Sequence, residues 1–477
     1  MLTIDKFEEA SEVVKRVTQD TKLIFSDYFS QMTGNKVYFK PENMQRTGAY
    51  KLRGAYYKIS TLTEEERAKG LITASAGNHA QGVAYAAKAY GAKAVIVMPT
   101  TTPLIKVERT KSYGAEVVLY GDVYDDACAH AYELAEEHGY TFIHPFDDPA
   151  VATGQGTIAM EIIKELPLVD YILVPIGGGG LATGVSTLAK LLNPNIKVIG
   201  VEPAGANCLQ VSLDKGEVTT LPTVNTIADG TAVKTPGEHV FPYLQKNLDD
   251  VITVEDDELI VSFLDMVENH KMIVENSGLL TVAALKHLNV KGKKVVSVLS
   301  GGNMDVITMA SVVQLGLIQR DRIFTISVLL PDRPGELTKV SQKIAEQQGN
   351  IIKLDHNQFY STNRKDVYKR QGLVNIGAEE EKGNALVKET YPLLKECKDI
   401  NFIGNVEARD IPKGVCDVVV CEAFVGNVIL KLYEGVGATL ISKVKAGMMS
   451  TLRSKIGALL VKPALKETLK SFDARCV

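Results

Sequence analysis

Six short runs rich in valine and isoleucine alternate with alanine-rich helical patterns between about residue 70 and residue 320. Such alternation is typical of a doubly wound α/β fold, because consecutive parallel strands need a crossover helix between them. Ligands of such sheets bind beyond the carboxyl ends of the strands, so the loops after the runs are the places to search for a site. The six runs are AKAVIVMP, AEVVLYG, YTFIHPF, DYILVPIG, IKVIGVEP and KKVVSVLSGG.

The composition restricts the class of protein and of partner. A chain of 477 residues, 45% of them hydrophobic, is long enough for roughly two to four packed domains. The net charge of -4 comes from interspersed charges and supports neither nucleic-acid binding nor a basic membrane-binding patch. No signal peptide or apolar spanning segment is present, and the 6 cysteines are scattered without zinc-site spacing. We therefore expect a cytoplasmic protein whose partners are small molecules.

Lys51 lies in the stretch QRTGAYKLRGA, residues 45–55, among small residues that are unusual around a solvated charge. One interpretation is a surface lysine at the start of a helix that runs through Tyr56 and Tyr57. The other is an amine held close to a ligand, either as a phosphate partner or as a group that bonds covalently to a carbonyl. The stretch alone leaves both open.

A glycine-rich loop, Gly177-Gly178-Gly179-Gly180-Leu181, follows the buried run YILVPI and leads into a helix. Its backbone N–H groups and the helix N-terminus can bind a phosphate, although a plain tight turn is the alternative. The loop also matches the dinucleotide fingerprint G-x-G-x-x-A, and Glu202 lies about 20 residues further on. A nicotinamide dehydrogenase is therefore the competing interpretation.

Two further loops offer polar groups at strand-to-helix turns. Ser75-Ala76-Gly77-Asn78-His79 can bind a carboxylate through N–H groups and the Ser75 hydroxyl, and Ser300-Gly301-Gly302-Asn303 follows the run VVSVL. A dehydrogenase explains neither these loops nor Lys51. Pyridoxal phosphate needs a lysine amine, a phosphate loop and a partner for its ring nitrogen, so the set predicts this cofactor.

Five ordered stretches carry a family resemblance: ENMQRTGAYKLRGA, SAGNHAQGVA, PIGGGGLATG, TIADGTAV and SVLSGGNMD. With them, residues 1 to about 320 resemble the fold-type II pyridoxal-phosphate enzymes of tryptophan synthase β-like fold, and among these threonine ammonia-lyase (threonine dehydratase). The resemblance implies two lobes with doubly wound sheets, the small lobe of roughly 48–150 being inserted in the large lobe. It also implies a homodimer or tetramer and a role in isoleucine biosynthesis or threonine catabolism.

The resemblance assigns a role to each loop. Lys51 would carry the cofactor and then remove the α-proton, and Asn78 would hydrogen-bond the ring hydroxyl. Gly177 to Leu181 would bind the phosphate, Ser75 to His79 the substrate carboxylate, and Ser300 would face the ring nitrogen. Lys51, Ser75 and Asn78 are thus the expected catalytic residues. The implied reaction is β-elimination, which converts L-threonine to 2-oxobutanoate and ammonia, and L-serine to pyruvate and ammonia.

Two positions depart from close relatives of this family. Serine racemase uses a serine directly before Gly-Asn-His as a second base, and this chain has Ala76 there, which favours a lyase. The same relatives bind a divalent metal through a Glu-Pro motif and a carboxylate six residues on. Glu202 and Pro203 are present but the later position is Cys208, so we expect no metal.

Residues 321–360 resemble the first half of an ACT regulatory domain. The run FTISVLL is followed by the turn Asp332-Arg333-Pro334-Gly335, a helix over 336–348 and the strand NIIKLDH. In that family the turn helps to form an amino-acid effector site. The chain leaves the pattern before the second half, so a module that packs in a dimer without an effector is an equal alternative.

A different family pattern begins after the polar stretch 361–371, which we interpret as a junction. Residues 372–477 resemble the C-terminal part of the phosphate acyltransferase that makes acyl-phosphate for phospholipid synthesis. Glu422-Ala423 stand where that family has Asp-Gly, and the N-terminal portion is absent, so we expect no acyltransferase activity. Two truncated modules meeting at a junction suggest an artificial join of two coding fragments, a chimera.

Overall fold

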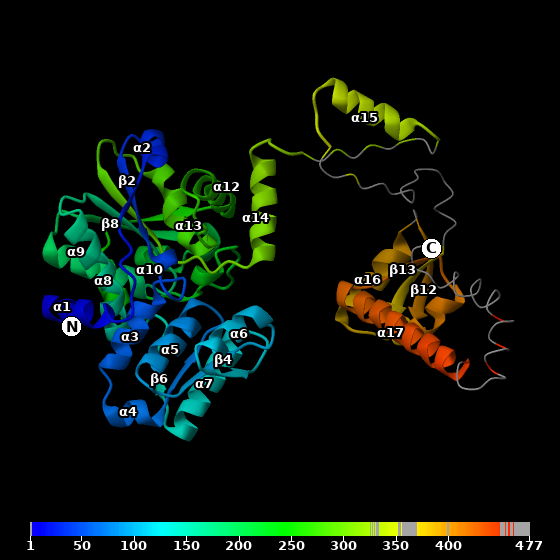
Figure 1. The fold of residues 1–477 in the computed structure, drawn as a ribbon, viewed down its shortest axis with the longest axis horizontal. Helices are drawn as coiled ribbons and strands as arrows, with labels where there is room; N and C mark the ends of the chain where they lie inside the picture. Colours follow the sequence, from blue (N-terminus) through cyan, green and yellow to red (C-terminus); the bar gives the residue numbers. More distant parts are fainter. Residues whose placement is uncertain are drawn as a thin grey trace. The chain divides into compact units, whose positions relative to one another are not determined.

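The computed structural model describes the following residues: 2–324, 326, 328, 330, 333–351, 354, 370–397, 400–448, 454, 457 and 461. The chain divides into two compact units, Met1–Thr325 and Ile326–Val477 (Figure 1). Both are α/β, and the first contains all the residues expected to form the site. Each unit is considered by itself.

The larger sheet of the first unit has six strands in the order β1-β2-β10-β7-β8-β9. All neighbours pair in parallel except β1, which is antiparallel to β2 at one edge. Parallel pairing between strands distant in sequence is the topology expected from the alternating pattern. The strands are β1 (Ile24–Ser26), β2 (Lys36–Pro41), β7 (Tyr171–Pro175), β8 (Lys197–Pro203), β9 (Asp250–Val254) and β10 (Lys294–Leu299).

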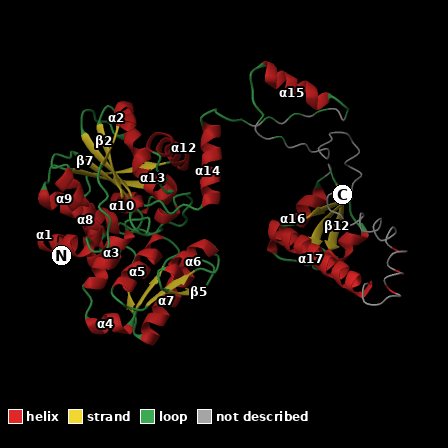
Figure 2. Ribbon diagram, in the orientation of Figure 1, coloured by secondary structure: helices red, strands yellow, loops and turns green. Residues whose placement is uncertain are grey.

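Four helices cover the two faces of this sheet: α8 (Pro149–Glu165), α9 (Gly180–Leu192), α12 (Asp256–Asp265) and α13 (Asn276–Ala283). Ile172 and Val174 of β7 pack in one hydrophobic core with α8 and α9, whereas Leu173 packs in another with α12 and α13. Because successive strand residues point to opposite faces, the sheet is buried on both sides (Figure 2).

The smaller sheet of the first unit has four parallel strands in the order β5-β4-β3-β6. Its central strands are also covered by helices on both faces. Ile72 packs against α7 (Tyr124–His138), and the neighbouring Leu71 packs in the core that contains α5 (Asn78–Ala89). The chain therefore contains the two doubly wound sheets that were expected. The strands are β3 (Leu71–Ala74), β4 (Ala94–Met98), β5 (Glu116–Leu119) and β6 (Thr141–Phe142).

Helix α3 (Lys51–Ser60) begins at Lys51 and crosses two other helices at glycine residues. A Cβ added at Gly82 of α5 would lie 3.1 Å from the carbonyl carbon of Lys51. One added at Gly154 of α8 would lie 2.7 Å from the carbonyl oxygen of Arg53. The missing side chains let three backbones approach closely, so the start of α3 is held on two sides.

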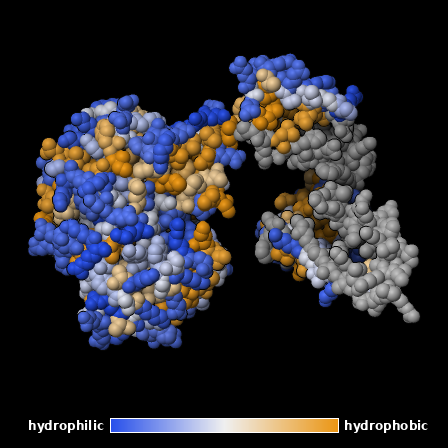
Figure 3. All heavy atoms as spheres, in the orientation of Figure 1, coloured by the Kyte–Doolittle hydropathy of each residue, from blue (hydrophilic) through white to orange (hydrophobic). Residues whose placement is uncertain are grey.

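Apolar residues are exposed on α14 (Val306–Gln319), where Figure 3 shows apolar surface on the first unit. They are Val306, Ile307, Leu315 and Ile318. This exposure does not amount to a spanning segment. Across the part of the chain that the structure describes, every helix is too short or too polar to cross a membrane.

The second unit contains a three-stranded parallel sheet in the order β12-β11-β13. The stretches DINFIGN and CDVVVCEAF contain β12 and β13, and the long helix α17 begins at Ala423. The elements are β11 (Arg370–Asn375), α16 (Ala385–Glu396), β12 (Asn401–Glu407), β13 (Val418–Val420) and α17 (Ala423–Met448).

The range 321–360 is described in part. Helix α15 (Glu336–Glu346) lies within the expected 336–348, and none of its residues is buried. Parts of FTISVLL, of the 332–335 turn and of NIIKLDH lie outside the described residues, as do 361–369 of the expected junction. Arg370 and Gln371, placed in that junction from the sequence, are the first residues of β11.

Candidate active site

Lys51, the glycine loop and Ser300 follow three neighbouring strands of the larger sheet. β10 pairs in parallel with β2 on one side and with β7 on the other. The chain after β2 leads to Lys51, β10 ends directly before Ser300, and β7 ends shortly before Gly177. Because parallel strands end at the same edge of the sheet, the structure brings these three segments together.

Backbone hydrogen bonds tie the segment before Lys51 to the Ser300 loop. The Tyr50 N–H donates to the Ser300 carbonyl at 3.1 Å, and the Gly302 N–H donates to the Gly48 carbonyl at 2.9 Å. Ser300 itself is only 3% exposed. The serine expected to face a ring nitrogen is therefore adjacent in space to the lysine expected to carry the cofactor.

The Lys51 amine points to the loop before α8, where its Nζ donates to the Pro145 carbonyl oxygen at 2.6 Å. Burial lowers the pKa of Lys51 to about 8, although the Glu275 carboxylate acts in the opposite direction. A lowered pKa provides neutral amine near physiological pH, which both covalent attachment and proton removal require. The surface-lysine interpretation is therefore not supported.

The glycine loop is packed tightly on one side. A Cβ at Gly178 would lie 2.3 Å from the Phe146 ring, and one at Gly180 would lie 2.6 Å from the Phe146 carbonyl oxygen. Gly179 has φ +97°, a left-handed conformation that favours glycine. Among the described residues, the N–H groups of Gly177 to Gly179 have no hydrogen-bond acceptor, although Gly178 and Gly179 are buried. Such unpartnered donors at the N-terminus of α9 fit a phosphate.

The loop from Ser75 to His79 connects β3 to the N-terminus of α5. The Ser75 hydroxyl accepts the Gly77 N–H at 3.2 Å, and Ala76 and Gly77 are half-buried. The His79 ring is buried against the Ile143 carbonyl, at 2.9 Å from Nε2, and burial lowers its pKa to about 3. His79 could therefore contact a carboxylate through its backbone N–H, but its side chain is engaged elsewhere.

Asn78, the first residue of α5, contacts Asn303 of the Ser300 loop and Glu275, which the sequence did not single out. Its Nδ2 donates to Glu275 Oε1 at 2.6 Å, and its Oδ1 accepts from Asn303 Nδ2 at 2.9 Å. Burial and the nearby Asp229 raise the pKa of Glu275 to about 7. A sequence signal existed for Glu275, since a lone carboxylate interrupts an apolar stretch directly before Asn-Ser-Gly.

Glu202 would have to hydrogen-bond a ribose in a dinucleotide site, but it makes other hydrogen bonds in the structure. It is completely buried, and its two oxygens accept the N–H groups of Leu209 at 2.9 Å and Gln210 at 2.8 Å. It therefore caps α10 (Cys208–Lys215), which argues against the dehydrogenase interpretation. In the described residues, no three His, Cys, Asp or Glu side chains form a group that could hold a metal ion.

A buried ion network lies two residues beyond Lys51. The fully buried Arg53 donates to both oxygens of Glu42, at 2.8 and 2.9 Å, and to both oxygens of Glu161, at 2.6 and 2.8 Å. Lys40 is also fully buried and lies 2.6 Å from Glu161. Burial alone would lower the pKa of Arg53, but the two carboxylates hold it above its ordinary value. The network joins α3 to α8 and to the end of β2.

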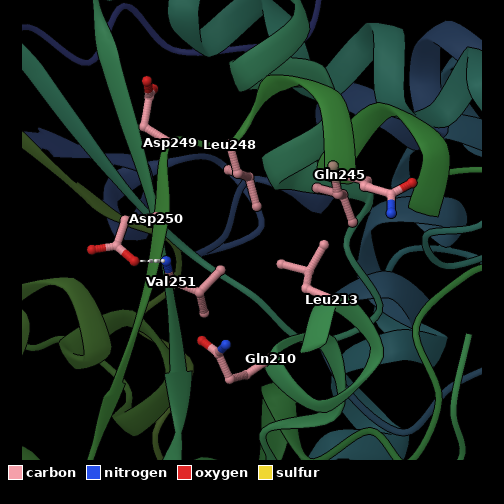
Figure 4. Close-up of a pocket in the computed structure, with 8 residues that line it drawn as sticks. Gln210, Leu213, Gln245, Leu248, Asp249, Asp250 and Val251 are labelled. Atoms are coloured by element: carbon pink, nitrogen blue, oxygen red, sulfur yellow. Dashed lines mark hydrogen bonds between the residues drawn. The ribbon is translucent and has the colours of Figure 1, made fainter. Parts of the chain in front are cut away.

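A shallow surface pocket lies between α10, α11 (Phe241–Asn247) and β9 (Figure 4). Leu213, Leu244 and Leu248 form its apolar part, and Gln210, Gln245 and Asp250 contribute polar groups. None of the expected site residues lines it. We therefore place the site at the carboxyl edge of the larger sheet and not in this pocket.

Comparison with known proteins agrees with this geometry. The family model described as "Pyridoxal-phosphate dependent enzyme" matches residues 14–301. The chain belongs to this family. Pyridoxal phosphate is therefore its cofactor, and the Lys51 amine together with the unpartnered N–H groups of the glycine loop fits that group.

Individual relatives of the family cover most of the first unit. The chain is 43% identical over 358 residues to the L-threonine ammonia-lyase of Thermotoga maritima, covering 75% of this chain and 89% of that protein. The structure of the processed form of threonine deaminase isoform 2 from Solanum lycopersicum is 40% identical, with a TM-score of 0.63, covering 66% and 90%. Maize serine racemase is 36% identical, with a TM-score of 0.62, covering 67% and 98%.

A second family model, described as "Fatty acid synthesis protein", matches residues 239–477. Its range overlaps the first match over 239–301, where β9 and β10 belong to the larger sheet of the first unit. The similarity therefore bears chiefly on the second unit.

The lowered pKa of Lys51 predicts the pH at which pyridoxal phosphate attaches to the cofactor-free chain. Attachment needs the neutral amine, and the neutral fraction of Lys51 increases as the pH rises through its pKa. We expect the attachment rate to reach half of its maximum near pH 8 instead of near the ordinary lysine value of 10.5. Stopped-flow absorbance over a pH series measures this, and a half-maximum above pH 10 would contradict it.

Gly178→Ala is expected to destabilise the chain by about 1–3 kcal/mol, because the new methyl group overlaps the Phe146 ring. It is also expected to weaken cofactor binding by displacing the phosphate loop. Chemical denaturation and cofactor titration measure the two effects. Gly435→Ala is the control for stability, since Gly435 is an exposed residue of helix α17 at which a Cβ meets nothing within 4 Å. Equal stability of the two variants would contradict the packing argument.

Proposed function

We propose that the chain is an L-threonine ammonia-lyase that uses pyridoxal phosphate and also accepts L-serine. The observation that carries this proposal is the partly buried amine of Lys51, with its lowered pKa, next to both the Ser300 loop and the loop that contains Pro145 and Phe146. The printed activities of the Thermotoga maritima and Solanum lycopersicum proteins support it. The first of these is matched over 89% of its own length.

In this proposal each loop binds a different part of the reacting molecules. The N–H groups of Gly177 to Leu181 hold the cofactor phosphate, Asn78 contacts the ring hydroxyl and Ser300 the ring nitrogen. Ser75 to His79 hold the carboxylate of the substrate, with His79 acting through its backbone. Lys51 carries the cofactor at Nζ and, once free, accepts the α-proton there.

Bound pyridoxal phosphate supplies an electron sink for the charge that develops at the α-carbon. Ser300 offers a neutral hydroxyl to the ring nitrogen, which does not keep that nitrogen protonated as a carboxylate would. With this residue at the ring nitrogen, the chemistry that the bound cofactor would supply is loss of the β-hydroxyl group as water in preference to transamination. The released aminocrotonate takes up water and yields 2-oxobutanoate and ammonia.

Racemisation of serine is the second candidate, because maize serine racemase shares the fold at 36% identity. A racemase needs an acid–base group on each side of the α-carbon. Ala76 stands at the position where we expect the second base, and its methyl group cannot transfer a proton. The lyase is therefore favoured.

The deciding experiment mixes the full-length chain, loaded with pyridoxal phosphate, with L-threonine and measures 2-oxobutanoate and ammonia. Formation of both in equal amounts is expected. A parallel incubation with L-serine is analysed for pyruvate and for D-serine. A cofactor-loaded chain that forms D-serine but no keto acid would overturn the lyase proposal in favour of the racemase.

For the remainder of the chain we propose a truncated ACT-like module over 321–360, a junction over 361–371, and a phosphate acyltransferase-like fragment over 372–477 without activity, joined in a chimera. The proposal is supported by the match of 239–477 to the fatty acid synthesis family and by α15, which has no buried residue. Detection of acyl-phosphate formation by the full-length chain would refute the inactive assignment.

We further propose a homo-oligomer, a dimer or tetramer, that acts in the cytoplasm on small-molecule substrates. This rests on the family resemblance and on the sequence composition. Sedimentation velocity of the cofactor-loaded chain tests the oligomeric part, and a purely monomeric species would contradict it.

A further inference from the structure

Glu275 is a buried carboxyl group with no part in the proposed chemistry. It is 8% exposed and directly precedes α13. Its backbone N–H donates to the Gly301 carbonyl at 3.0 Å, so it sits beside the Ser300 loop. Its Oε1 accepts from the Asn78 side chain at 2.6 Å. Glu275 is therefore a buried hydrogen-bond acceptor in direct contact with Asn78, the residue expected to contact the cofactor ring.

Asn78 belongs to a series of side-chain hydrogen bonds that begins at Arg109. The contacts of Asn303 with Arg109 and Thr47 decide which groups donate and which accept along the series. A guanidinium can only donate, and Arg109 Nη1 lies 2.9 Å from Asn303 Oδ1. A backbone carbonyl can only accept, and the Thr47 carbonyl lies 2.7 Å from Asn303 Nδ2. Both contacts require the same orientation of the Asn303 amide.

The orientation of the Asn303 amide in turn determines the orientation of the Asn78 amide. Asn303 Nδ2 donates to Asn78 Oδ1 at 2.9 Å, which leaves Asn78 Nδ2 to face Glu275. The ionised Glu275 carboxylate only accepts, so it favours the same Asn78 orientation that Asn303 requires. In this orientation Asn78 Oδ1 accepts from Asn303, and Nδ2 retains one further N–H.

We propose that Glu275 is a positioning residue, which holds the Asn78 amide so that its remaining N–H donates to the ring oxygen of pyridoxal phosphate. The inference rests on the proposed function, in which Asn78 contacts that oxygen. A donor at this position stabilises the deprotonated ring oxygen, whereas an acceptor would stabilise the protonated form. Glu275 thereby influences the protonation state of the cofactor without touching it.

The same hydrogen bonds explain why the orientation of the Asn78 amide is fixed. Arg109 and Asn78 lie on α6 (Leu104–Ser112) and α5, which flank the smaller sheet, whereas Asn303 and Glu275 follow β10 and precede α13 beside the larger sheet. Each side-chain link from Arg109 through Asn303 and Asn78 to Glu275 therefore joins elements of the two sheets. The amide is held from both sides of the site.

The test compares Glu275→Ala with the unsubstituted chain, each loaded with pyridoxal phosphate. We expect cofactor affinity to fall about tenfold, as for one lost hydrogen bond to a charged group, and the absorption bands to shift toward the protonated ring oxygen. Glu275→Gln keeps an acceptor and should restore most of both readouts. Asp265→Ala is the control: Asp265 is another buried carboxylate, hydrogen-bonded to Tyr28 at 2.8 Å and paired with Arg320, and its loss should leave the bands unchanged.

The decisive step repeats Glu275→Ala in an Asn78→Ala background. If Glu275 acts through Asn78, the second substitution causes no further change in affinity or in the bands. An undiminished effect in that background, or no effect of Glu275→Ala beyond that of Asp265→Ala, overturns the inference while the proposed function stands. Failure of the unsubstituted chain to bind the cofactor overturns both.

If the Glu275→Ala variant does not fold, Arg109→Met provides a second test, because Arg109 lies at the other end of the series of hydrogen bonds. Its guanidinium bond to Asn303 is exposed, so folding should be retained. The bands are expected to shift in the same direction by a smaller amount. An unchanged spectrum would overturn the inference.

Discussion

Replacing Lys51 by alanine is expected to reduce the formation of 2-oxobutanoate from L-threonine by at least about 10³-fold. The substitution removes both the covalent attachment of the cofactor and the base that accepts the α-proton, each of which contributes strongly to rate. The variant should still bind pyridoxal phosphate weakly through the glycine loop. A keto-acid assay combined with reduction and mass measurement of the protein–cofactor bond tests both statements.

Lys58→Ala is the matched control for this prediction. Lys58 lies on the same helix α3, where it pairs with Asp148 at 2.7 Å. Its loss should leave the rate close to that of the unsubstituted chain. If Lys51→Ala retained a comparable rate, a different residue would have to carry the cofactor and the proposed function would fail.

Arg53→Met is expected to destabilise the first unit by about 3–5 kcal/mol, since it leaves the buried Glu42 without its guanidinium partner and leaves Glu161 paired with Lys40 alone. Glu42 is completely buried, and Arg53 at 2.8 Å lowers its pKa against the opposing effect of burial. Without the guanidinium, protonation or hydration of Glu42 must compensate. Chemical denaturation of the cofactor-free chain, followed by far-UV circular dichroism, measures the loss of free energy of unfolding.

Two further variants separate the ion network from general sensitivity to substitution. Arg16→Met changes an exposed arginine and should alter the free energy of unfolding by less than about 0.5 kcal/mol. Adding Glu42→Gln to Arg53→Met should recover part of the loss, because an uncharged amide is less costly to bury than an unpaired carboxylate, while Glu161 stays paired with the buried Lys40. A double variant less stable than Arg53→Met alone would contradict this explanation.

The sequence alone determined the class of fold and the position of the loops that we propose for the site. All six apolar runs are strands of the two sheets, namely β4, β5, β6, β7, β8 and β10. A parallel strand buried on both faces has a local signal, an unbroken apolar run, and a helix after it has another. The glycine loop, the Ser75 loop and Lys51 at the start of α3 could be placed for the same reason. β1, β2, β3 and β9 were not among those runs.

Only the tertiary structure decided which side chains meet at these loops. Arg53 bonds to Glu161, 108 residues away, and Asn78 to Glu275, 197 residues away. Gly178, Gly179 and Gly180 are required by packing on Phe146 and Leu244, whatever the loop binds, and Glu202 caps a helix instead of binding a ribose. Such pairings depend on strand order and helix crossing, which no local pattern encodes. The chemistry of the site follows from contacts between segments that become neighbours only when the two sheets have formed.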